Sequence, residues 1–186
     1  CSLATVTGRG LLSSLLLSSI YRPVRNPADL VMALAELYMA QAYLPHREKE
    51  LGSMRFLLWT ALTTGGSNAA FLLLMRLLAR AGQCGTDLIT NQGLWPLIMV
   101  CTTVKALDWP SVPMDVLGLV SVPSRWYPLG LAIGLSAANG MVQWETFAAI
   151  AFGYAYRLLR LEERLLPSRS LAHELERRWL SLLPGL

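Results

Sequence analysis

Apolar residues along the chain gather into five long segments that are separated by short polar connections. The strongest segment, residues 56–75, runs for twenty positions without a charge. As an α-helix it would rise about 30 Å, which is the thickness of the hydrocarbon core of a bilayer. The candidate spans are residues 27–45, 55–80, 91–106, 126–139 and 141–159. The pattern therefore predicts an all-α fold, a polytopic membrane bundle of about five transmembrane helices.

The polar connections divide the chain into three parts. We expect an N-terminal loop segment at residues 1–26, a transmembrane domain at 27–160 and an amphipathic C-terminal tail at 161–186. Apolar residues recur at helical spacing in the tail, at Leu171, Leu175, Trp179 and Leu182. A helix of this kind can lie along a membrane surface or dock on a partner protein, because both arrangements bury the same stripe. Prolines interrupt the connection at 108–125.

Composition supports a membrane protein. Hydrophobic residues make up 54% of the chain, charged residues 15%, and the mean hydropathy is +0.43, which leaves too little polar surface for a soluble domain. The net charge of +4 does not indicate a nucleic-acid partner, because the basic residues lie between the apolar segments and form no stripe. The partners that we expect are lipids and other membrane-protein subunits.

The basic residues also predict an orientation. Five spans alternate the connections between two faces of the membrane, and the face of the N-terminal segment carries five Lys and Arg residues. The other face carries eleven: Arg47, Lys49, Arg55, Lys105, Arg125, Arg157, Arg160, Arg164, Arg169, Arg177 and Arg178. The positive-inside rule therefore predicts a C-terminal tail on the cytosolic or matrix side.

The first 28 residues have a composition with two interpretations. They contain no acid, three arginines and five serines, as organellar transit segments do. The alternative is a lumenal or intermembrane loop that lacks acids. The transit-like composition favours the mitochondrial inner membrane over the endoplasmic reticulum.

Cysteine and histidine patterns predict no metal, cofactor or disulfide. The three cysteines, Cys1, Cys84 and Cys101, form no paired spacing, and the two histidines, His46 and His173, are far apart in polar connections.

Three features inside the apolar segments need an explanation. Glu36 is costly in a membrane unless it faces the bundle interior, where it could bind a cation or a client, or pair with a hydroxyl group or a buried water. The small residues of segment 65–68 could form a kink that lines a client groove, although packing is the favoured interpretation. Ala149-x-x-x-Gly153 allows close approach of helices, and internal packing is favoured over a dimer contact.

The junction between the first two spans resembles a signature of the rhomboid superfamily. The pattern Glu48-x-x-x-Gly52-Ser53-x-Arg55-Phe56 is similar to the stretch that closes the second transmembrane helix of that family. Further along the chain, Gly93-Leu94-Trp95-Pro96 stands where rhomboids have Gly-x-Ser-Gly, and Ala149-x-x-x-Gly153 where they have Gly-x-x-x-Gly. The resemblance covers about residues 8–160 and implies that the family's first transmembrane helix is missing from this chain.

The resemblance also implies that the chain is not an enzyme. Active rhomboids cleave peptides in the membrane with a serine that a histidine activates, and an asparagine helps to hold the oxyanion. The corresponding positions here are Trp95, Thr146 and Glu36. An indole is no nucleophile at neutral pH, a threonine takes up no proton near pH 7, and a carboxylate repels an oxyanion. The chain thus resembles a pseudoprotease, closest to the Derlin and ubiquitin-associated-domain branches.

Two classes of function follow from the resemblance. In the first, the chain is a structural accessory subunit of a larger membrane-protein complex, in the mitochondrial inner membrane. In the second, it handles clients for retrotranslocation from the endoplasmic reticulum, as Derlins do. We favour the first, because the tail shows neither a ubiquitin-binding domain nor the phenylalanine-glycine box of Derlins, and because the N-terminal composition is transit-like.

Overall fold

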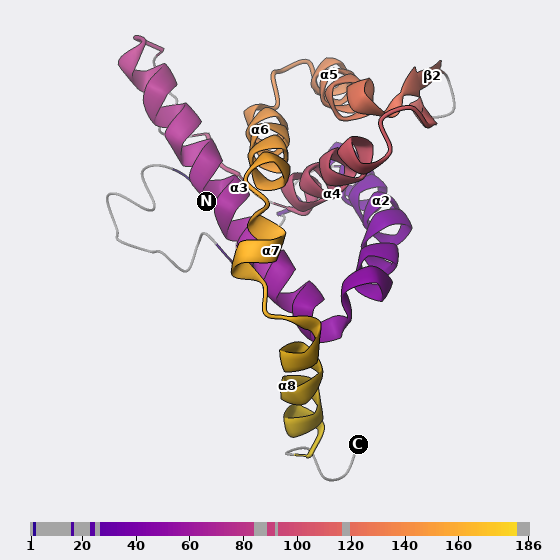
Figure 1. Ribbon diagram of the computed structural model, residues 1–186. Coiled ribbons are helices and arrows are strands. Elements are labelled where there is room, and N and C mark those ends of the chain that lie inside the picture. The colour runs from indigo at the N-terminus through magenta and orange to yellow at the C-terminus, as the bar shows by residue number, and fades with distance from the viewer. Residues whose placement is uncertain are drawn as a thin grey trace.

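The computed structural model describes residues 2, 16, 23–24, 27–83, 89–91, 93–116 and 120–181, and most of them are helical (Figure 1). The main helices are α2 (Pro27–Leu51), α3 (Ser53–Arg80), α4 (Trp95–Asp108), α5 (Tyr127–Asn139) and α6 (Trp144–Leu158). The shorter ones are the 3₁₀ helix η3 (Ser124–Trp126), α7 (Leu161–Leu165) and α8 (Arg169–Ser181). The all-α prediction is confirmed, and each of the five apolar segments forms a helix.

Helix α2 is longer than the sequence predicted. The predicted apolar span ended at residue 45, and a proline inside a helix removes an N–H that the helix interior requires. The helix instead continues through Pro45 to Leu51. The added turn is stabilised at Arg47, whose guanidinium reaches Glu50 one turn later and Glu162 of α7. Tertiary ion pairs therefore hold a helical turn that proline alone would weaken.

Helix α3 is the one helix among the described residues that is long and apolar enough to cross a membrane, by length and composition. It has 28 residues, and only 33% of its most apolar window is buried within the chain. Helices α4, α5 and α6 have 14, 13 and 15 residues. These three helices would rise about 20 to 23 Å, less than the roughly 30 Å of a bilayer core.

Helix α4 lies at the centre of the fold. All but three of its fourteen residues are buried. It packs against α6 along its length and also contacts α2 and α3. Figure 1 shows α2 and α3 diverging from their junction with α4 and α6 between them. The core is therefore built around a short helix whose first residue is already inside the protein.

The connection between α4 and α5 contains a β-hairpin that the sequence analysis missed. Strand β1 (Pro113–Val116) pairs with antiparallel β2 (Val120–Pro123), and Pro113 lies opposite Pro123. We expected only an irregular connection because of its prolines. Pro113 and Pro123 instead pair with each other at the open end of the hairpin, as the first residue of β1 and the last residue of β2, where a missing N–H costs little. Beyond the ladder, the Ser124 hydroxyl donates to the carbonyl of Val112 over 2.5 Å.

The C-terminal tail is helical over Arg169–Ser181, and it contacts the bundle through another part of its surface than the predicted stripe residues Leu171 and Leu175. Helix α8 contacts α3, and its residue Ala172 is buried. Leu171 and Leu175 of the predicted apolar stripe are 51% and 36% exposed. Leu171 and Leu175 are therefore not part of the surface that contacts α3. Leu182 lies outside the described residues, as does the N-terminal segment 1–26 apart from residues 2, 16, 23 and 24.

The turn between α2 and α3 depends on a glycine, which allows a prediction. Gly52 has φ 83° and ψ 153°, a conformation that is almost confined to glycine. We expect Gly52→Ala to destabilise the fold by about 1 to 3 kcal/mol through backbone strain alone, because a Cβ there would meet nothing within 4 Å. Thermal unfolding in mild detergent measures the effect. Gly134→Ala is the matched control, since Gly134 has open space and lies within α5; an equal loss in both variants would contradict the interpretation.

Candidate functional site

Glu36 and Trp95 meet at the start of α4. The Glu36 carboxyl oxygen Oε1 accepts a hydrogen bond of 2.7 Å from the backbone N–H of Trp95. Glu36 is only 3% exposed, so α2 turns this polar side chain into the bundle. The first N–H groups of a helix have no partner within the helix, and the N-cap residue Leu94 provides no side-chain cap. Glu36 therefore caps α4 from a neighbouring helix.

Two neighbours adapt the start of α4 to this carboxyl group. Pro96 has no N–H, so it removes one donor that would need a partner. Gly93 has φ 85°, and a Cβ on it would stand 2.5 Å from Oε1 of Glu36. Glycine is therefore required at position 93 for two reasons: its backbone conformation, and the space that the Glu36 carboxyl group occupies.

The other two residues of the predicted degenerate centre are also buried. Trp95 is the first residue of α4 and is 4% exposed. Within the described part of the chain, its indole N–H has no hydrogen-bond partner. Thr146 lies in the first turn of α6, and its hydroxyl donates to the carbonyl of Gln143 over 2.7 Å. The geometry joins Glu36 to position 95, whereas the Thr146 hydroxyl is engaged at the start of its own helix.

A buried amide pair beside this site was not predicted. The Asn91 side-chain amide donates to Oδ1 of Asn68 over 2.5 Å, and both residues are 1% exposed. The bond ties the segment before α4 to the middle of α3. In the sequence, Asn68 stands out only as part of a small-residue stretch, because its partner is 23 residues away. The signal that could have revealed it is an amide within a charge-free span, since such a group needs a partner.

Three residues of the predicted family signature meet in the turn between α2 and α3. The Ser53 hydroxyl donates to Oε1 of Glu48 over 2.9 Å, and the Gly52 N–H donates to the Glu48 carbonyl over 2.8 Å. Glu48 thus closes the turn with its backbone and its side chain. This accounts for the spacing of Glu48, Gly52 and Ser53 in structural terms, without any chemical role.

The small residues of α6 face α4, as the packing interpretation predicted. Ala149 is fully buried, and a Cβ on Gly153 would lie 2.9 Å from the Cβ of Thr103. Thr103 is itself fixed, because its hydroxyl donates to the carbonyl of Met99. On α3, Gly66 lies against the ring of Phe152 in α6, and the helix continues through this position. Both small-residue stretches therefore serve internal packing.

We expect Gly153→Ala to loosen the contact between α4 and α6. Overpacking costs about 1 to 3 kcal/mol, and the better helix propensity of alanine returns about 0.5 to 1 kcal/mol. The net destabilisation should be about 1 to 2 kcal/mol, measured as a lower unfolding midpoint in detergent. The double variant Gly153→Ala with Thr103→Ser, which removes one of the crowding methyl groups, should recover part of the loss. No recovery would show that this contact is not the cause.

Arg47, near the end of α2, joins that helix to α3 and α7. Arg47 binds Glu50 at 2.8 Å and Glu162 at 2.5 Å, and its guanidinium stacks over the ring of Trp59 at 5.4 Å. Burial lowers the pKa of Arg47, but the hydrogen bond that Arg47 donates to Glu50 and the attraction of Glu162 outweigh burial and raise the pKa above its ordinary value. Arg47 is therefore a permanent cation that links α2 to the tail.

The groups at the candidate centre are a backbone N–H, an indole and a hydroxyl. Within the described ranges, no group of three or more His, Cys, Asp or Glu side chains could hold a metal ion. The candidate centre presents an N–H that is already bound by Glu36, an indole and a hydroxyl that donates within its own helix start. Comparison with protein-family models, curated proteins and solved structures gives no match to this chain.

Proposed function

We propose that the chain is a catalytically inactive, rhomboid-like integral membrane protein that acts as a structural accessory subunit of a larger membrane-protein complex. The observation that carries the proposal is the cap on α4. The Glu36 carboxyl group accepts the hydrogen bond of the Trp95 backbone N–H, and position 95 is where the family resemblance places the nucleophile. A protease needs that region open to a substrate carbonyl and its developing negative charge. Here it is closed by a side chain that also holds two helices together.

The distribution of polar and apolar residues on α2 supports a lipid environment. Glu36 faces the interior, while five large side chains of the same helix are at least half exposed: Leu30, Val31, Leu34, Leu37 and Tyr38. Buried polar residues elsewhere in the bundle include Thr63, Ser67, Asn68, Thr102 and Thr103. Polar side chains inside and large apolar ones outside are typical of helices that pack in a bilayer.

The start of α4 supports the same proposal. The segment before the helix is not helical, yet Asn91 is buried and Gly93 lies against Glu36. Irregular backbone at membrane depth is tolerated only where protein surrounds it and satisfies its polar groups. The Asn68–Asn91 bond and the Glu36 cap meet that condition. A short helix that begins inside the bundle is therefore compatible with a span of the proposed polytopic fold.

Ion pairs between helix ends support the proposed orientation. Arg47 and Glu162 join the end of α2 to α7, and Arg157 with Asp108 joins the end of α6 to the end of α4 over 2.5 Å. In a bundle of five spans, α2, α4 and α6 are the first, third and fifth spans, so their ends lie on one face of the membrane. This is the face rich in Lys and Arg. We propose that this face is the matrix side of the mitochondrial inner membrane. Protease treatment of intact mitoplasts tests the orientation. A C-terminal tag should be protected, and cleavage of the tag would be the contrary result.

Co-purification tests the accessory role. The full chain carrying an affinity tag, expressed at native levels and extracted in mild detergent, should recover a fixed set of membrane proteins in constant ratios. Recovery of many unrelated proteins in substoichiometric amounts would instead indicate the Derlin-like handling of clients. Glu36→Ala, which we expect to weaken the fold, should lower recovery of the whole set, whereas the exposed control Arg164→Gln should leave it intact.

A protease assay tests the proposed inactivity separately. The purified chain, reconstituted in lipid, should leave a transmembrane reporter peptide uncut. Cleavage that disappears in Trp95→Ala or Thr146→Val would overturn the proposal, because it would place catalysis at the very positions that we regard as degenerate.

A further inference from the structure

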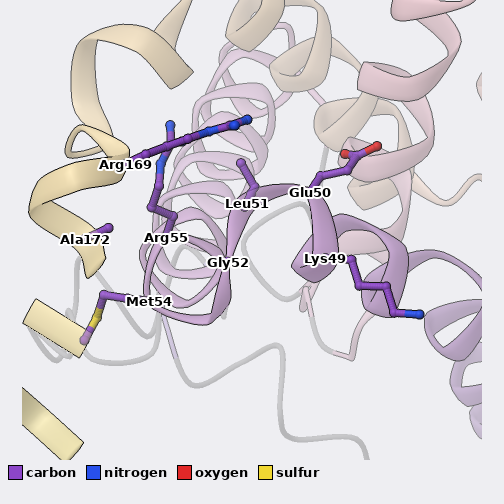
Figure 2. A pocket seen from close by; sticks show the side chains of 8 residues that line it. All are labelled: Lys49, Glu50, Leu51, Gly52, Met54, Arg55, Arg169 and Ala172. Atoms are coloured by element: carbon purple, nitrogen blue, oxygen red, sulfur yellow. The ribbon is translucent and has the colours of Figure 1, made fainter. Parts of the chain in front are cut away.

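A cavity of about 240 Å³ lies beside the turn between α2 and α3, where α8 docks. It is lined by Lys49, Glu50, Leu51, Gly52, Met54, Arg55, Arg169 and Ala172 (Figure 2). The volume is below the roughly 300 Å³ at which pockets for drug-sized ligands begin. The cavity therefore suits a small chemical group.

Two arginines dominate the charge of this cavity. Arg55, from α3, and Arg169, from α8, both line it, and their side chains cross in the view of Figure 2. The side chains of Lys49 and Glu50 extend away from it in the same view. Two like charges that converge on one space repel each other unless an anion lies between them. The geometry thus places two cations where a negative group would fit.

Among the described residues, none supplies that negative group. Across the described residues, no carboxyl group forms an ion pair with Arg55 or Arg169, and Nε of Arg55 is buried without a hydrogen-bond partner. Glu50, the one acid of the lining, is held by Arg47 at 2.8 Å and lies 3.2 Å from His46. The first turn of α3 contains no acidic residue, so the positive end of a 28-residue helix adds to the field.

We propose that this cavity binds a phosphate group between Arg55 and Arg169. Arginine forks match the oxygens of phosphate in two parallel hydrogen bonds, and a helix N-terminus adds to the attraction. The exposed Leu57 and Leu58 follow Arg55 on α3. The phosphate can therefore belong to an anionic lipid headgroup or to a soluble phosphate. The proposal goes beyond the accessory role and does not depend on it, because it concerns only the recognition of an anion.

Binding is measured on the full chain in a neutral detergent by the rise of its unfolding midpoint, since a ligand that binds only the folded state stabilises it. One arm adds inorganic phosphate at constant ionic strength, with chloride as the reference salt. The other arm adds phosphatidylglycerol to the micelles, with phosphatidylcholine as the reference lipid. The variants are Arg55→Gln and Arg169→Gln. Arg164→Gln removes an exposed arginine of α7 outside the cavity and is the matched control.

We expect a saturable rise with at least one of the two probes, and a loss of affinity of about ten- to a hundredfold in Arg55→Gln and in Arg169→Gln. Arg164→Gln should bind as the unchanged chain does. A rise with phosphatidylglycerol alone identifies the lipid as the source, and a rise with inorganic phosphate identifies a soluble ligand. No rise with either probe overturns the proposal, as does equal binding by all three variants. Arg169 is an exposed residue at the start of α8. An unchanged circular dichroism spectrum of Arg169→Gln would therefore show that a loss of binding is not a loss of fold.

Discussion

Gly93→Ala should destabilise the folded chain by about 2 to 6 kcal/mol, the largest effect that we expect from one methyl group. Two costs add at this position. A non-glycine residue at φ 85° is strained by about 1 to 3 kcal/mol. The new Cβ would also stand 2.5 Å from the buried carboxyl group of Glu36, and relieving that contact costs about 1 to 3 kcal/mol more. The unfolding midpoint in mild detergent measures the sum.

Gly82→Ala separates these two costs. Gly82 has nearly the same backbone angle, φ 86°, but a Cβ there would meet nothing within 4 Å. Gly82→Ala should therefore show the backbone strain alone, and the difference between the two variants should report the contact with Glu36. Equal losses in the two variants would mean that the carboxyl group of Glu36 is not packed against position 93 as we describe.

Glu36→Ala should cost about 2 to 5 kcal/mol. Truncation leaves the Trp95 N–H buried without its acceptor, which alone costs about 1 to 3 kcal/mol. It also leaves a cavity between α2 and the start of α4, and large-to-small changes in a core add a further cost that depends on relaxation. Removing an acid from a membrane segment is expected to help when the acid has no structural role. The sign of the effect therefore tests whether Glu36 is a cap.

Glu36→Gln is the matched comparison for this prediction. Glutamine keeps the shape of the side chain and a carbonyl oxygen that can accept the hydrogen bond from Trp95. We expect most of the stability to survive in Glu36→Gln. A stable Glu36→Ala together with an unstable Glu36→Gln would contradict the capping role and would point to a requirement for the acid itself.

The positions of the helices could be predicted from the sequence, because each helix carries its own apolar segment. The turn at Gly52 was identified for the same reason, since the residues that form it are adjacent in the chain. The extension of α2 past Pro45 could not be predicted. It depends on a contact between Arg47 and Glu162 across 115 residues, and local patterns contain no information about such a contact.

The candidate site was predictable only in part. Glu36 was singled out as an acid that must face the interior, which its burial supports. Its partner is a backbone N–H of another helix, and not the hydroxyl group or water that the sequence suggests, because the local pattern does not show which helix start lies beside it. The β-hairpin was not predicted, because Pro113 and Pro123 face each other at the open end of its ladder, where they interrupt no pairing. Partners that a fold brings together from distant segments thus account for most of what the sequence could not reveal.

The central claim is that lipid surrounds this bundle while its polar residues, Glu36 above all, are inside. Alkaline carbonate extraction of membranes from cells that express the full chain tests the claim most directly. The account predicts that the protein stays in the membrane pellet together with known integral proteins and is released only by detergent. Release into the aqueous supernatant as a folded, monodisperse species would contradict it, because the exposed leucines of α2 and α3 would then face water.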